Sequence, residues 1–139
     1  MNHFAIHSQL LADCHRLGQL GLCHVLLHKN ASVPWFILVP EVESEDLLGL
    51  PREQRNAALA EAVLVARFIT HDLGWAKINF AAIGNVVPQL HLHIVGRKPG
   101  DACWPAPVWG NLAGGSEYSA ARVGEIADAL RRRCSLQTL

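Results

Sequence analysis

The sequence predicts an α+β domain built on an antiparallel sheet. Its 139 residues are half apolar and 17% charged, which suits one compact domain with a sizeable core. Apolar residues recur at helical spacing in three segments, and short apolar runs typical of strands lie between them in pairs. The resulting order is helix, hairpin, helix, hairpin, helix. No repeat, low-complexity tract or change of composition divides the chain, so residues 1–139 are expected to form a single domain.

The first helix and the first hairpin are expected before residue 41. Apolar residues at three- and four-residue steps predict a helix over residues 8–20, with Gly18 and Gly21 at its end. Residues 22–28 form a short apolar run suited to a strand. A polar turn follows, and residues 33–40 predict a second strand that is bracketed by prolines.

A long helix is expected next. It begins at Pro51, because proline suits the first helical position. Its predicted apolar stripe consists of Leu59, Ala62, Val63, Ala66 and Ile69. Gly74 is placed to end this helix in a left-handed conformation.

The second hairpin and the last helix complete the predicted domain. Strands are expected at residues 77–83 and 90–95, and residues 84–85, Gly-Asn, are the turn signal between them. Residues 96–115 are rich in glycine and proline in their first part and are expected to be largely loop. A final helix is predicted over residues 119–133.

Charge and cysteine content exclude several classes of protein. Twelve Lys and Arg balance twelve Asp and Glu, which argues against binding to nucleic acid or to an anionic membrane. The apolar stretches fall short of the ~18 unbroken residues that a membrane-spanning helix needs. The four cysteines show no CxxC pair and no metal-like spacing, and no secretory signal is visible. We therefore expect a cytoplasmic protein with free thiols.

Two of the eight histidines are organised within one predicted strand. Successive side chains of a strand point to opposite faces, so Gln89, His91 and His93 are expected to share one face. The apolar residues between them take the other face. A neutral imidazole nitrogen is a competent nucleophile at phosphorus near pH 7, and a neighbouring side chain can donate hydrogen bonds to phosphate oxygens or to the leaving group.

Two other interpretations of this strand remain open on the pattern alone. His-x-His on a strand also suits zinc, but a third ligand from His71, His24 or a carboxylate has no recognisable spacing. Alternatively, the two imidazoles are partly buried and bonded to backbone groups.

Residues 88–97, Pro-Gln-Leu-His-Leu-His-Ile-Val-Gly-Arg, resemble the signature of the histidine triad (HIT) superfamily. The likeness extends along the chain from about residue 4 to about residue 118. Within this superfamily, the chain resembles the bacterial branch that is related to diadenosine tetraphosphate hydrolases. The further matching segments are Asn30 with residues 34–40, residues 77–79, residues 83–85, residues 104–105 and residues 107–110.

The resemblance implies a fold and an activity. The fold is a five-stranded antiparallel sheet with flanking helices, paired into a homodimer with a continuous sheet, and a loop and helix from about residue 98 extend it. The activity is that of a nucleotide hydrolase or nucleotidyl transferase, which cleaves a phosphoanhydride or phosphoramidate bond at a nucleoside α-phosphate. No metal or organic cofactor is built into such a site.

The resemblance also implies roles for individual residues. His91 corresponds to the nucleophile that is transiently nucleotidylated. His93 corresponds to the residue that contacts phosphate oxygens, and its backbone carbonyl steadies the other nitrogen of the nucleophile. Asn30 lies at the ribose-binding position, and Asn79 and Asn85 fall in the segment that approaches the phosphates.

One residue departs from the family pattern. Gln89 stands where the triad has its first histidine, and an amide cannot carry a proton through a catalytic cycle near pH 7. A non-catalytic nucleotide-binding protein is therefore the main alternative, and a metal-binding protein that uses His91 and His93 is a third.

Several other side chains are weighed against ordinary structural roles. Asn30 also suits a turn, where asparagine is common. Trp104 and Trp109 are expected to shape a pocket or a dimer contact, because a proline-rich loop cannot supply its own core. Arg97 is expected to be exposed and solvated rather than bound to phosphate. The remaining histidines, His28 among them, are assigned no role.

Overall fold

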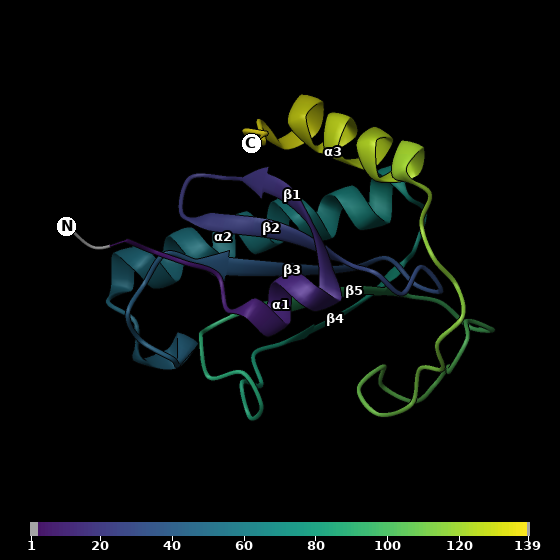
Figure 1. The fold of residues 1–139 in the computed structure, drawn as a ribbon, viewed down its shortest axis with the longest axis horizontal. Coiled ribbons are helices and arrows are strands. Elements are labelled where there is room, and N and C mark those ends of the chain that lie inside the picture. Colours follow the sequence, from purple (N-terminus) through teal and green to yellow (C-terminus); the bar gives the residue numbers. More distant parts are fainter. Residues whose placement is uncertain (1–2, 139) are drawn as a thin grey trace.

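The computed structural model describes residues 3–138 and consists of a twisted sheet with helices on both faces (Figure 1). All strand pairs are antiparallel, and the strand order is β1-β2-β3-β5-β4. The expected five-stranded antiparallel sheet with flanking helices is therefore confirmed. The elements are α1 (Ser8–Asp13), β1 (Cys14–Gln19), β2 (Cys23–His28), β3 (Trp35–Pro40), α2 (Arg52–Arg67), β4 (Lys77–Ala81), β5 (Leu92–Arg97) and α3 (Ala120–Cys134).

The sheet is covered on both faces, and each face has its own core. Val25 and Leu27 of β2 belong to the cluster that packs against α2 and α3, whereas Leu26 belongs to the cluster on the other face. The same alternation in β5 places Leu92 with the helices and leaves His93 on the opposite face. In Figure 1, α2 lies behind the sheet and α1 in front of it.

The prediction of one helix over residues 8–20 is wrong in its second half. Only Ser8–Asp13 is helical, and Cys14–Gln19 forms β1, which pairs with β2 through a bulge between Arg16 and Gly18. Cys14 and Leu17 are both buried because they lie on opposite faces of a strand that is covered on each side. Their three-residue spacing therefore imitates the periodicity of a helix.

The long helix begins at Arg52, one residue after the predicted start, and Pro51 is its N-cap residue. Its buried side differs in part from the predicted stripe. Ala58, Ala62 and Val65 are buried, whereas Leu59 and Val63 are 37% and 46% exposed. Of the predicted stripe, Ala62 and Ile69 are buried; the rest of the buried side is formed by Ala58 and Val65, so large apolar residues do not by themselves mark it. A wide turn, Phe68–Asp72, continues α2, and Gly74 follows with a φ of +79°.

The second hairpin lies where it is expected, with shifted ends. β4 stops at Ala81, and β5 begins at Leu92, two residues later than predicted. His91 and Gln89 therefore precede the strand instead of belonging to it. Within residues 3–138, no helix combines the length and the apolar character that crossing a membrane requires.

Candidate active site

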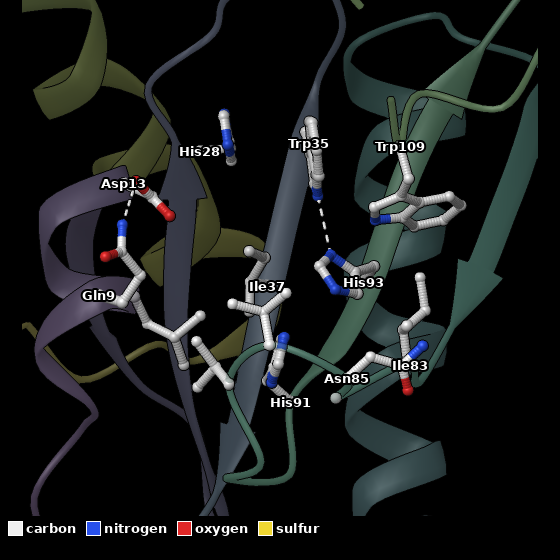
Figure 2. Close-up of a pocket in the computed structure, with 14 residues that line it drawn as sticks. Gln9, Asp13, His28, Trp35, Ile37, Ile83, Asn85, His91, His93 and Trp109 are labelled. Atoms are coloured by element: carbon white, nitrogen blue, oxygen red, sulfur yellow. Dashed lines mark hydrogen bonds between the residues drawn. The ribbon is translucent and has the colours of Figure 1, made fainter. Parts of the chain in front are cut away.

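A pocket of about 370 Å³ opens on the face of the sheet that is opposite α2. Figure 2 shows that its walls come from α1, from β2 and β3, from the turn around residue 85, from the approach to β5, and from Trp109 in the long loop. His91 and His93 both line it and are 6% and 7% exposed. The sequence prediction that these two imidazoles share one polar face is confirmed.

A backbone carbonyl fixes the protonation of His91. Its Nδ1 lies 2.7 Å from the carbonyl oxygen of Gln89. A carbonyl oxygen only accepts hydrogen bonds, so in the neutral ring Nδ1 carries the proton and Nε2 keeps its lone pair. The resemblance implied that the carbonyl of His93 would do this; that expectation is wrong, because the ring of His91 turns back towards the residue two positions before it.

An indole fixes the opposite protonation of His93. The N–H of Trp35 donates to Nδ1 of His93 at 3.1 Å. Because an indole nitrogen only donates, Nδ1 of His93 is unprotonated and Nε2 carries the hydrogen. Burial, followed by the neighbouring His91 and His28, lowers the pKa of His93 from 6.5 to about 3. His93 is therefore a neutral donor near pH 7.

The two histidines consequently offer complementary atoms. Their ring centroids lie 4.9 Å apart with an interplanar angle of 67°. His91 has an unprotonated Nε2 that can attack an electrophile, and His93 has an Nε2–H that can stabilise charge beside it. Nothing in the residue types alone assigns these tautomers; Gln89 and Trp35 assign them.

Aromatic rings support this pair from the side of the sheet. His28 stacks on Trp35 with ring centroids 4.0 Å apart and an interplanar angle of 7°. Trp109 meets Trp35 and His93 edge to face, at 6.2 Å and 5.2 Å. The indole nitrogen of Trp109 is the one buried side-chain polar atom without a partner among the described residues. Trp109 thus shapes the pocket, as expected, whereas Trp104 lies over the guanidinium of Arg97.

The opposite wall holds residues that sequence reasoning missed. Gln9 and Asp13 of α1 line the pocket, and the amide of Gln9 donates to the Asp13 carboxylate at 3.0 Å. Nδ1 of His28 accepts from the backbone N–H of Asn30 at 3.1 Å, so its Nε2 carries the proton. Burial lowers the pKa of His28. Asp13 lies in the half of the predicted helix that is correct and had no signal of its own. His28 had a signal, because it lies two residues after the buried Leu26 in β2 and therefore shares its face.

Gln89 does not point into this pocket. Its side-chain amide donates to the carbonyl of Ala5 and accepts from the N–H of His7, both at 2.8 Å. The prediction that Gln89 shares a face with His91 and His93 is therefore wrong. The alternation of a strand does not extend to residue 89, because β5 begins only at Leu92.

Of the three asparagines, only Asn85 lines the pocket. Asn30 caps its own turn, accepting from the N–H of Ser32 and donating to the carbonyl of Ala113. This is the role that asparagine commonly takes in turns. Asn79 accepts a hydrogen bond from Arg97 at 3.0 Å.

Arg97 is buried rather than solvated, contrary to expectation. It is 1% exposed and forms a two-pronged ion pair with Asp101, with N–O distances of 2.8 and 3.0 Å. This hydrogen bonding lowers the pKa of Asp101 to about 2. The pair closes the start of the loop that carries Trp109, so Arg97 supports the pocket from outside it.

The residues of the site do not form a recognisable metal centre. Between residues 3 and 138, no three His, Cys, Asp or Glu side chains are grouped so that they could hold a metal ion.

The five-stranded antiparallel sheet and the two imidazoles at its pocket define the class of protein: small domains that carry histidines on a strand beside a pocket. The family model described as the HIT domain matches residues 9–100, and the chain belongs to the histidine triad family. No protein with a curated functional description matches the chain.

Solved structures agree with this assignment. The chain is similar to a histidine triad protein from Bradyrhizobium japonicum, with 38% identity over 94% of this chain and 97% of that one and a TM-score of 0.87. A histidine triad protein from Marinobacter aquaeolei is 38% identical over 96% and 98%, with a TM-score of 0.88. One from Sinorhizobium meliloti is 32% identical over 94% and 96%, with a TM-score of 0.87.

Proposed function

We propose that the protein is a nucleotide hydrolase or nucleotidyl transferase that acts at a nucleoside α-phosphate through a nucleotidyl-His91 intermediate. The observation that carries the proposal is the pair of opposite tautomers, an unprotonated Nε2 on His91 beside an Nε2–H on His93. Membership of the histidine triad family supports it.

The proposed reaction has two steps. In the first, the lone pair on Nε2 of His91 forms a bond to the α-phosphorus, and the bond from phosphorus to the leaving group breaks with its electrons on the leaving group, which takes a proton from solvent. The ring gains positive charge, which the carbonyl of Gln89 stabilises through the Nδ1–H. In the second, water attacks phosphorus and gives up a proton to solvent, the N–P bond breaks with its electrons returning to Nε2 of His91, and a nucleoside monophosphate leaves.

His93 serves the same reaction as a donor. Its Nε2–H is available for a non-bridging phosphate oxygen or for the leaving atom, where negative charge develops. Its lowered pKa keeps it neutral, so it does not repel the imidazolium that forms at His91. Asn85 is proposed to lie near the phosphates, because it lines the same pocket.

The charges around His91 favour one kind of leaving group. A second hollow of about 640 Å³ lies on the other side of His91 and is lined by Glu45 and Asp46. The first pocket is lined by Asp13, and no lysine or arginine lines either cavity among the described residues. A chain of phosphates has no cation to neutralise it there, so we propose that nucleoside phosphoramidates are turned over faster than dinucleoside polyphosphates.

We further propose a cytoplasmic homodimer that needs no metal or organic cofactor. β4 is one of the two edge strands of the sheet within residues 3–138, and its Phe80 is 44% exposed, which suits pairing with a second copy. Gln19 of the other edge strand, β1, already pairs with Gln137. All four cysteines are free thiols, which suits a reducing compartment.

Turnover of a substrate panel tests the proposal. Adenosine and guanosine phosphoramidates and dinucleoside tetraphosphates are incubated with the wild type and with His91→Ala. The expected result is turnover of at least one phosphoramidate by the wild type, reduced by roughly 10³-fold or more in His91→Ala. Equal turnover by the two proteins would overturn the mechanism. Nucleotide binding without turnover across the panel would favour a non-catalytic binding protein.

A further inference from the structure

We propose that Gln89 is a positioning residue that ties the N-terminal strap, residues 3–7, to the carbonyl that sets the tautomer of His91. The consequence for turnover rests on the proposed function; the consequence for the tautomer does not. Gln89 occupies the first position of the triad, yet its side chain does not line the pocket and forms its hydrogen bonds with Ala5 and His7.

Gln89 binds the strap as a neighbouring strand would. Its amide N–H donates to the carbonyl of Ala5 and its amide oxygen accepts from the N–H of His7, each at 2.8 Å. These two backbone groups lie on one side of an extended segment, and the donor and acceptor of a carboxamide point the same way. The donor and acceptor of an imidazole diverge, so a histidine at this position could not satisfy both groups in the same geometry.

The backbone of the same residue holds the nucleophile. The carbonyl of Gln89 accepts from Nδ1–H of His91 at 2.7 Å, and it lies in a stretch outside the regular strand ladder. The hydrogen bonds of the side chain to Ala5 and His7 are therefore what anchors this stretch on its outer side. Losing them frees the carbonyl to move and lets the proton of His91 shift to Nε2, which removes the nucleophilic lone pair.

The strap also carries one wall of the pocket. Ile6 is buried, and the ring of Phe4 stacks on His24 at 5.2 Å. The imidazole of His7 accepts from the N–H of Gln9 and so caps α1, the helix whose last residue is Asp13. The hydrogen bonds of Gln89 thus connect His91 to the opposite wall of the pocket through a single residue.

Three variants isolate the two hydrogen bonds of the Gln89 side chain in the full-length chain. Gln89→Met keeps the length of the side chain and removes both hydrogen bonds. His7→Pro removes the one N–H that donates to Gln89, and the φ of −53° at His7 already suits proline. His7→Ala is its matched control, because it loses the same imidazole cap but keeps that N–H.

The readouts are the ¹⁵N shifts of the His91 ring, which report its tautomer, and kcat against KM. We expect a pure Nδ1–H tautomer in the wild type and in His7→Ala, and a mixture in Gln89→Met and His7→Pro. We expect kcat to fall roughly tenfold or more in Gln89→Met and His7→Pro, and the double variant to be no worse than Gln89→Met. A pure Nδ1–H tautomer in Gln89→Met, or losses that multiply in the double variant, would overturn the inference. Because the tautomer is observed without substrate, an inactive wild type contradicts the proposed function and leaves this test intact.

Discussion

At the scale of single residues, the chemistry depends on which nitrogen of each imidazole carries its proton. Two acceptor or donor groups decide this, the carbonyl of Gln89 for His91 and the indole of Trp35 for His93. Neither group belongs to a histidine. Gln89 acts through its backbone carbonyl and Trp35 through its side chain.

Removal of the indole N–H tests this assignment. Trp35→Phe keeps an aromatic ring against His28 but leaves Nδ1 of His93 without its donor. We expect the free energy of unfolding to fall by about 1 kcal/mol and the ¹⁵N shifts of His93 to indicate mixed tautomers. Trp109→Phe is the matched control, because it removes an N–H that has no partner. An unchanged His93 tautomer in Trp35→Phe would refute the assignment.

The lowered pKa of His93 makes stability depend on pH. The unfolded chain binds a proton near pH 6.5, whereas the folded protein resists protonation at His93 down to about pH 3. Stability is therefore greatest above pH 6.5 and decreases as the pH falls, by on the order of 2 kcal/mol between pH 7.5 and pH 5. His28 contributes in the same direction. Urea denaturation at the two pH values should show a shallower loss in His93→Gln; equal slopes would count against a neutral buried His93.

Sequence reasoning found the two central residues and misplaced their neighbours. His91 and His93 follow from their alternation in the sequence together with the family resemblance, although His91 lies one residue before β5. Gln89, Asn30 and Asn79 face other partners, because their positions depend on where strands end and on contacts with residues far away in the chain. The spacing of residues along the sequence shows neither where a strand ends nor which distant residues come into contact.

At the scale of elements, the loop after β5 depends on one buried ion pair. Arg97 closes the end of the strand and Asp101 lies four residues into the loop, and both side chains are almost fully buried. The pair fixes the direction in which the loop leaves the sheet, and with it the position of Trp109 over the pocket.

Breaking that pair should be costly. Asp101→Asn leaves the guanidinium of Arg97 buried without its counter-charge, so we expect a loss of about 3 kcal/mol of unfolding free energy. Asp128→Asn, which breaks the exposed pair with Arg131, should cost less than ~1 kcal/mol. Urea denaturation of the two variants measures the difference. Similar losses in both would show that the buried pair does not hold the loop.

Most elements were predictable because their local pattern agrees with their surroundings. The hairpin of β2 and β3, the start of α2 and the turn at Gly74 all lie where the sequence indicates. β1 was not predictable, since its apolar spacing suits a helix and only its pairing with β2 makes it a strand. Its hydrogen bonds to β2, and not its local sequence pattern, therefore make this segment a strand.

At the scale of the whole molecule, the free edge of β4 predicts an assembly. We expect light scattering to give twice the 15.2 kDa mass of one chain. Phe80→Glu should shift the protein to a monomer, because two like charges would meet across the paired strands. Val86→Glu changes a 90% exposed residue outside β4, in the turn that follows it, and should leave the dimer intact. A monomeric wild type would refute the predicted continuous sheet.

The central claim is that His91 is the nucleophile, and trapping its adduct tests this most directly. The protein is mixed with a nucleoside phosphoramidate, quenched within milliseconds, digested and measured by mass spectrometry. We predict that the peptide containing His91 gains the mass of one nucleotidyl group during turnover, and that the adduct disappears when substrate is exhausted. Steady turnover without any adduct on His91, or an adduct on another residue, would contradict the account.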